Sequence, residues 1–239
     1  MKIAVLGAGN LGSAIIKNAS RNAEVIAVRR RKELLPDIEN VTAVSEFEET
    51  REANIFLVTL KPDVFRKNLE RIGEIVKGKP LISFVPGIKL EEMLKYIDNP
   101  FRAMTNIGIE DGGVIACYPP ETAEHLRFLE SDFILCRSEE ELEAMTSFIG
   151  SAPAIIAKLI NAFVISAVRE GVSYEHALKA SVNVFGTAGR LYEKYGFDGM
   201  LRRIATPGGT TAEGLRNVVM AEKYLMDALI SASRRVDEL

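Results

Sequence analysis

The sequence lacks several features that would point to particular classes of protein. Its only two cysteines, Cys117 and Cys136, form no CxxC pair, and the chain has no N-terminal secretory signal. We therefore expect neither a disulfide framework nor a metal site. The formal charge of −3, with scattered basic residues, argues against a nucleic-acid surface. The most apolar window, 152–168, is interrupted by Lys158 and Asn161 and is shorter than the roughly 20 residues of a membrane span. These absences predict a soluble, cytoplasmic protein that binds no membrane.

The sequence pattern changes near residue 140. Before this point, short apolar runs alternate with helical patterns, which predicts a parallel sheet with crossover helices. After it the strand patterns vanish, and only helical segments follow. We expect an α/β protein, with a Rossmann-like dinucleotide-binding domain over 1–143 and an all-α domain for dimerisation over 144–239. The expected strands lie in "KIAVLG", "EVIAVR", 53–60, 79–85, 101–106, 114–119 and 132–138.

One expected helix, 153–168, is apolar nearly all round. Such a helix must be buried on every side. Either it forms the centre of its own bundle, or a second subunit covers it and the protein is an obligate dimer. We favour the dimer, because the remaining hundred or so residues can hardly bury the helix alone.

The segment "GAGNLG" at 7–12 follows the first expected strand and opens a helix. This is the context that a dinucleotide-binding fingerprint requires. Gly7 permits the tight turn, Gly9 lets the pyrophosphate approach the backbone, and Gly12 lets the helix pack closely on the strand. The amides of the first helical turn, which includes Asn10 and Leu11, would bind the phosphates. The alternative is a tight turn that holds no ligand.

The second strand ends in "VRRRKE", at the place where NAD-specific sites usually carry a carboxylate. Arg29, Arg30 and Arg31 stand there instead. A guanidinium binds phosphate through a planar fork of donors. We infer NADP(H) as the cofactor, held through its 2′-phosphate. The alternative is NAD(H) beside a solvated basic turn.

A second anion site is predicted at "TPGGTT", 206–211, directly before the last helix. Its Pro-Gly-Gly turn exposes backbone amides that can bind a carboxylate, and Thr210 and Thr211 add hydroxyl groups. The alternative is a helix start without a ligand, in which Thr210 and Glu213 have the spacing of a capping box.

The chain offers no obvious histidine catalyst. His125 and His176, its only histidines, both lie in helical patterns that place them at the surface. Reduction of a ketone usually needs a strong general acid at the developing alkoxide. A cyclic imine can arrive already protonated, so that hydride delivery and orientation remain. The residues therefore favour imine reduction.

These segments together resemble those of the pyrroline-5-carboxylate reductases, nearly from end to end. In this resemblance Arg30 falls on the family's cofactor arginine, and Lys61 and Pro62 of "TLKPD" border the cofactor. It implies that Thr211 hydrogen-bonds the imine region of the substrate, while Gly208, Gly209 and Thr210 offer backbone donors to its carboxylate. It also implies an interleaved helical homodimer that shares each site between subunits, with larger assemblies known in the family. The matching segments are "GAGNLGSAI", "VRRRKE", "TLKPD", "ISFVPGIKLEEM", "GSAPA" and "TPGGTT".

The chain also departs from the family. It has "MTNIG" at 104–108 where the family has "MPNTP", so that Asn106 is kept but both prolines and the threonine are missing from the segment that faces nicotinamide and substrate. Asn161 replaces an acidic residue, and "KLIN" at 158–161 is similar to the Lys-x-x-Asn pair of β-hydroxyacid dehydrogenases. The predicted activity is NADPH-dependent reduction of 1-pyrroline-5-carboxylate to L-proline. The alternatives are a reductase of another imine or a hydroxyacid, and a dinucleotide-binding sensor without catalysis.

Overall fold

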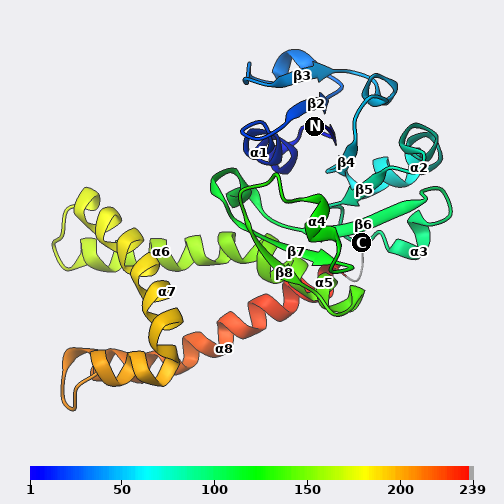
Figure 1. The fold of residues 1–239 in the computed structure, drawn as a ribbon. Coiled ribbons are helices and arrows are strands. Elements are labelled where there is room, and N and C mark those ends of the chain that lie inside the picture. Colours follow the sequence, from blue (N-terminus) through cyan, green and yellow to red (C-terminus); the bar gives the residue numbers. More distant parts are fainter. Residues whose placement is uncertain (237–239) are drawn as a thin grey trace. The chain divides into compact units, whose positions relative to one another are not determined.

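A computed structural model describes residues 1–236 of the chain, so the last three residues of the predicted C-terminal helix lie outside the described residues. The chain divides into two compact units (Figure 1). The first comprises Met1–Ser151 together with the chain's last residues from Ala232, and the second comprises Ala152–Ser231. The domain boundary that we predict, between 143 and 144, falls eight residues before the point where the units meet along the chain.

The first unit is built on one eight-stranded sheet with the order β3-β2-β1-β4-β5-β6-β7-β8. The strands at its centre are apolar along their whole length because helices cover both faces of the sheet. In β4, for example, all four residues are buried. The strands are β1 Lys2–Leu6, β2 Glu24–Val28, β3 Val41–Val44, β4 Ile55–Val58, β5 Pro80–Ser83, β6 Asn99–Met104, β7 Val114–Tyr118 and β8 Asp132–Leu135.

The prediction of a parallel sheet is wrong for one strand pair. All neighbouring strands are parallel except β6 and β7, which pair antiparallel with Ala103 opposite Cys117. A parallel return would need a crossover of a dozen or more residues. Only the short 3₁₀ helix η3, Ile107–Asp111, and a turn at Gly112 in the left-handed conformation (φ 87°) separate the two strands.

Two helices cover opposite faces of the sheet. Helix α1, Asn10–Ala19, packs with the face that carries Ile3 and Val5. Helix α2, Pro62–Val76, packs with the face that carries Ala4 and Leu6. Successive side chains of β1 point to opposite faces of the sheet and so belong to two separate cores. The shorter helical elements are η1 Lys32–Leu34, η2 Phe47–Thr50, α3 Leu90–Met93, α4 Thr122–His125, α5 Glu139–Met145 and the π-helical turn η4 Thr146–Ser151.

Cys117 and Cys136 are both buried, but in different cores. Cys117 is paired in register with Leu135, so the next residue, Cys136, points to the opposite face of the sheet. The Cys136 amide donates to the Cys117 carbonyl oxygen at 2.9 Å, a bond between neighbouring backbones. Burial raises the pKa of the Cys117 thiol to about 12 and also raises the pKa of Cys136.

A buried charged cluster joins β6 to α5. Arg102 has no solvent exposure, and its guanidinium donates to Glu139 at 2.8 Å and to Glu143. The same Glu139 oxygen accepts the Leu90 amide at 2.8 Å, at the start of α3. One arginine therefore ties the sheet to α5, and Glu139 extends the link to α3.

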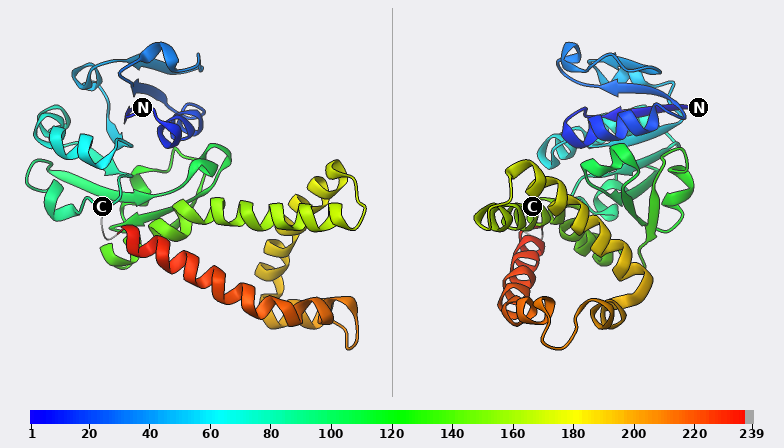
Figure 2. Two further views of the ribbon diagram at one scale, coloured as in Figure 1. Left: turned by 180° about the vertical axis from the view of Figure 1, so that it is seen from behind. Right: turned by 90° about the vertical axis from the view of Figure 1, so that its left-hand side faces the viewer.

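The second unit consists of α6 Ala152–Arg169, α7 Tyr174–Ile204 and most of α8 Thr210–Val236. Helices α6 and α7 contact one another (Figure 2). Gly171 (φ 89°) lies in the connection between α6 and α7, and Gly196 (φ 66°, ψ 174°) interrupts the helical conformation within α7.

These helices bury little of their apolar surface within one chain. Val164 is the one buried residue of α6, whereas Phe163, Ile165 and Val168 are exposed. The continuous helical stretch Glu139–Arg169 is long and apolar enough to cross a membrane by length and composition, although core helices of water-soluble proteins pass the same test. The interpretation in which α6 is buried at the centre of its own bundle therefore does not hold within a single chain.

Candidate functional site

The turn between β1 and α1 requires glycine at two positions. Gly7 has φ 109°, and a Cβ on it would lie 3.0 Å from a side-chain carbon of Leu60. A Cβ on Gly12 would lie 1.9 Å from the Gly7 carbonyl oxygen and 2.6 Å from Thr59 Oγ1. The Thr59 hydroxyl in turn donates to that same carbonyl oxygen. The turn between β1 and α1 therefore packs against the residues after β4 so closely that neither Gly7 nor Gly12 could carry a side chain.

Gly9 serves a different purpose in the same turn. It caps the N-terminus of α1, and a Cβ placed on it would meet nothing within 4 Å. The amides of Asn10, Leu11 and Gly12 belong to the first helical turn and have no carbonyl partner within the helix. No acidic residue occupies that turn. Open space over free amides at a helix N-terminus fits a dinucleotide pyrophosphate.

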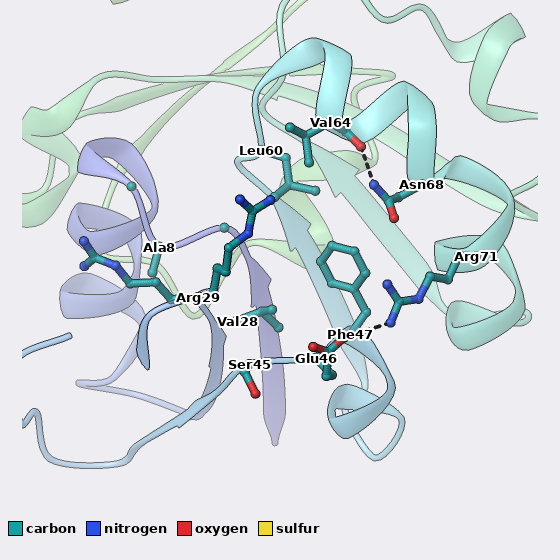
Figure 3. A pocket seen from close by; sticks show the side chains of 13 residues that line it. Ala8, Val28, Arg29, Ser45, Glu46, Phe47, Leu60, Val64, Asn68 and Arg71 are labelled. Atoms are coloured by element: carbon teal, nitrogen blue, oxygen red, sulfur yellow. Dashed lines mark hydrogen bonds and ion pairs between the residues drawn. The ribbon is translucent and has the colours of Figure 1, made fainter. Parts of the chain in front are cut away.

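A cleft of about 510 Å³ opens from this turn at the carboxyl ends of β1, β2 and β3. Its wall comes from the glycine turn, the end of β2, the start of η2 and one side of α2 (Figure 3). A crevice outside the carboxyl ends of parallel strands is where ligands bind in open α/β sheets. The lining residues are Gly7, Ala8, Gly9, Val28, Arg29, Arg30, Ser45, Glu46, Phe47, Leu60, Val64, Asn68 and Arg71.

The two predicted cofactor arginines both line this cleft, directly after β2. The Arg29 amide donates to the Val44 carbonyl oxygen at 2.9 Å, and its guanidinium donates to the Leu34 carbonyl oxygen at 3.0 Å. Arg30 is exposed. Two guanidiniums beside the end of β2 provide the positive charge that a 2′-phosphate needs, and Arg29 is already held by its own loop.

Lys61 and Pro62 form the start of α2 rather than part of the cleft lining. Lys61 is the N-cap residue, and Pro62 takes the first helical position, where its missing N–H costs nothing. Their neighbours Leu60 and Val64 do line the cleft. The lysine is exposed, as a side chain that borders a ligand from outside would be.

Asn106 uses both ends of its side chain within the first unit. Its oxygen accepts the Gly108 amide at 2.7 Å and so caps η3, while its Nδ2 donates to the Ile149 carbonyl oxygen at 2.8 Å in η4. It stands two residues after the end of β6, at the carboxyl edge of the sheet. In this structure the amide shapes the segment after β6.

The second predicted anion site, 206–211, belongs to the second unit. Gly208 has φ 72°, and the Gly209 amide donates to the Thr206 carbonyl oxygen at 3.0 Å, so the turn requires its glycine pair. Helix α8 begins at Thr210, and the amides of its first turn are free for an anion. The capping box is not formed, because Glu213 pairs instead with Arg216 at 3.0 Å and its amide donates to Gly209.

Four cleft residues, Glu46, Phe47, Asn68 and Arg71, belong to no recognisable sequence pattern. Arg71 donates to Glu46 at 3.0 Å, and its guanidinium lies 5.2 Å from the centre of the Phe47 ring. It also holds Glu48 through two hydrogen bonds, which lower the pKa of that carboxyl to about 2. Asn68 completes this side of the cleft. These residues come from η2 and α2, and only the fold brings them together.

Comparison with known proteins places these features in a family. Residues 139–239 match the family model described as pyrroline-5-carboxylate reductase dimerisation, and residues 2–87 match NADP oxidoreductase coenzyme F420-dependent. A pyrroline-5-carboxylate reductase of Arabidopsis thaliana is 30% identical over 216 residues, covering 84% of this chain and 78% of that protein. The chain belongs to the pyrroline-5-carboxylate reductase family. It is an oxidoreductase, as the sequence resemblance implies.

Other relatives agree over the full length. The pyrroline-5-carboxylate reductase of Methanosarcina acetivorans is 29% identical over 263 residues, covering 100% of this chain and 97% of that protein. The structure of the Plasmodium falciparum pyrroline carboxylate reductase with NADP bound superposes with a TM-score of 0.86 at 19% identity, covering 100% and 97% of the two chains. The Streptococcus pyogenes enzyme gives 0.84 at 22% identity, covering 100% and 99%. These likenesses confirm the predicted fold, a Rossmann-like unit followed by helices, and the dimerisation match spans the exposed apolar helix α6.

Proposed function

We propose that this protein reduces 1-pyrroline-5-carboxylate to L-proline with NADPH as the reductant. The observation that carries the proposal is the cleft after β1 and β2, which joins an open glycine turn to two arginines in a chain of this family. When bound there, NADPH supplies the hydride that adds to the imine carbon. One hydride and one proton convert the C=N bond to CH–NH.

The residues of the chain divide the remaining tasks. Gly9 and the first-turn amides of Asn10, Leu11 and Gly12 hold the pyrophosphate, and Arg29 and Arg30 hold the 2′-phosphate. Lys61 and Pro62 border the cofactor. NAD(H) is the alternative cofactor, bound more weakly because these arginines then lack their phosphate.

Substrate binding falls to the residues around the second anion site. The amides of Gly208 and Thr210 bind the substrate carboxylate, while Gly209, whose amide donates to the Thr206 carbonyl oxygen, shapes the turn between them. The Thr211 hydroxyl accepts a hydrogen bond from the protonated ring nitrogen. Asn106 fixes the segment after β6 that faces the nicotinamide and the substrate. Because the iminium already carries its proton, no histidine is needed as an acid.

We further propose a homodimer in which the exposed apolar residues of α6 pack against a second copy. Phe163, with 54% of its surface exposed, and Ile165 and Val168 are the side chains that such packing would cover. The dimerisation match to residues 139–239 supports this role. The same burial accounts for the apolar helical stretch Glu139–Arg169 without a membrane, in keeping with a soluble, cytoplasmic enzyme.

The test is an assay of NADPH oxidation with pyrroline-5-carboxylate, run beside NADH, on the wild type and Thr211→Ala. We expect Thr211→Ala to lower kcat about 10- to 100-fold, the cost of one hydrogen bond to a charged group, with little change in NADPH affinity. Thr42→Ala, an exposed strand position in β3, is the matched control and keeps full activity. Unchanged turnover in Thr211→Ala would remove its assigned role. Loss of all activity in Lys158→Ala, with the dimer intact, would favour the hydroxyacid alternative instead.

A further inference from the structure

Asn18 is a polar residue near the end of α1, and it has no solvent exposure. Its Nδ2 donates to the Ile109 carbonyl oxygen at 2.7 Å and to the Glu130 carbonyl oxygen at 3.2 Å. Its Oδ1 accepts the Glu130 amide at 2.9 Å. Burying a polar side chain costs free energy that its hydrogen bonds must offset. A leucine would fill a similar space without that cost, so the value of Asn18 lies in what its hydrogen bonds hold.

The bond to Ile109 continues as a relay of hydrogen bonds through η3 to Asn106. The Ile109 carbonyl oxygen accepts Asn18 Nδ2, and the Ile109 amide donates to the Asn106 carbonyl oxygen at 3.1 Å. The Asn106 side chain caps the same turn by accepting the Gly108 amide at 2.7 Å. A Cβ on Gly108 would lie 2.8 Å from Asn106 Oδ1, so the turn is closely packed. Asn18 therefore fixes the distance between α1 and the segment that begins at Asn106.

Two surface residues of α1 also bind η3, but through bonds that are exposed to water. Lys17 Nζ lies 2.7 Å from a Glu110 carboxylate oxygen, and the two side chains are 42% and 39% exposed. The Arg21 guanidinium donates to the Glu110 carbonyl oxygen at 2.9 Å. Exposed ion pairs hold their partners weakly, because water screens the charges and long side chains lose rotamer freedom. The short, buried side chain of Asn18 is a more rigid link.

We propose that Asn18 is a positioning residue for hydride transfer. It sets the spacing between the cofactor, which the first turn of α1 holds, and the segment after β6, which faces the nicotinamide and the substrate. Asn18 touches neither ligand, because it is fully buried and stands eight residues after Asn10, about 12 Å along the helix. The inference rests on the proposed function and adds a residue that acts through Asn106. Misplacing reacting groups by about 1 Å can slow a reaction about 100-fold.

The test uses Asn18→Leu, which keeps the volume of the side chain and removes its hydrogen-bonding groups. We expect kcat with pyrroline-5-carboxylate to fall about 10-fold or more, within the range that a misplacement of about 1 Å produces. The NADPH dissociation constant, measured by calorimetry without substrate, should stay within about twofold of the wild type, because the first-turn amides are unchanged. With NADPH deuterated at the transferred position, the variant should show a primary isotope effect on kcat, because hydride transfer then limits turnover.

Three further variants separate positioning from stability. Ile75→Ala opens a cavity in the core between the sheet and α2, so it should lower Tm as Asn18→Leu does but leave kcat unchanged. Lys17→Ala removes an exposed bond to η3 and should change kcat less than about twofold. Asn18→Ser keeps one hydroxyl donor at the buried site, so its kcat should lie between those of Asn18→Leu and the wild type. All rates are measured well below the lowest Tm, with folding checked by circular dichroism.

The possible failures can be told apart. If folded Asn18→Leu keeps the wild-type kcat, or if Ile75→Ala loses as much, Asn18 only stabilises the fold and the proposal is wrong. Weaker NADPH binding at an unchanged kcat would overturn it too. If Asn18→Leu does not fold, Asn18→Ser decides, and a wild-type kcat in that variant overturns the proposal. In each of these cases the proposed reductase stands. If the wild type does not oxidise NADPH with pyrroline-5-carboxylate, the proposed function fails and the role of Asn18 fails with it.

Discussion

Replacing Arg102 by methionine should destabilise the first unit strongly. The arginine has no solvent exposure, while the side chains of its partners Glu139 and Glu143 are 18% and 17% exposed. Removal of one member of a buried ion pair typically costs about 3–5 kcal/mol because a charge is left without its partner. Since both carboxylates retain some access to water, we expect a value near the lower end, about 3 kcal/mol. In a chain of this size that corresponds to a fall in Tm of about 6–12 °C.

The assay is urea unfolding followed by circular dichroism, at fixed protein concentration so that dimerisation does not vary. A charge-free version, Arg102→Met with Glu139→Gln and Glu143→Gln, should recover much of the loss, because no buried charge then remains unpaired. Glutamine at 139 also keeps an oxygen that can accept the Leu90 amide. A loss below about 1 kcal/mol in the single variant, or no recovery in the triple variant, would refute the reasoning.

Three other predictions follow from the structure. Gly12→Ala should lower the free energy of unfolding by about 1–3 kcal/mol through overpacking, whereas Gly9→Ala, whose Cβ meets open space, should fold normally and lose NADPH binding in calorimetry. Glu48, with its pKa lowered from 4.5 to about 2, stabilises the fold above pH 4.5, and this contribution disappears as the pH falls toward 2. The Glu48 side chain is 43% exposed. We therefore expect Glu48→Gln to lower the free energy of unfolding by less than about 1 kcal/mol at pH 6, and by still less at pH 3. Urea unfolding at the two pH values measures both differences. Cys117 and Cys136 should resist iodoacetamide at pH 8 in the native protein and react once it is unfolded, as mass spectrometry would show; rapid native labelling would contradict their burial.

The parts of the fold predicted correctly from sequence are those encoded by neighbouring residues. Buried strands appear as unbroken apolar runs, such as "IFLV" in β4, and the glycine turn carries its spacing within six residues. The reversed direction of β7 is not encoded in this way, because a strand has the same apolar pattern in either direction. The information lies in the short connection with its left-handed Gly112, which reads in the sequence as an ordinary loop.

The parts that escaped prediction depend on residues far apart in the chain. Asn18 is buried in α1, where its Nδ2 donates to the Ile109 carbonyl oxygen at 2.7 Å and its oxygen accepts the Glu130 amide at 2.9 Å. Arg102 likewise finds its partners 37 and 41 residues later. A polar residue within a helix or strand pattern gives no sign of which distant groups it will meet. For the same reason the cleft residues Phe47 and Asn68 come together only once η2 and α2 lie side by side in the folded chain.

The exposed apolar side chains of α6 have a consequence for the life of a newly made chain. Residues 1–151 contain the residues of two hydrophobic cores, and all of them are synthesised before α6. Helix α6 emerges later and finds little apolar cover within its own polypeptide. Until it meets another copy, each new chain exposes an apolar surface. The rate of synthesis and the local concentration of other copies therefore decide between dimerisation and aggregation.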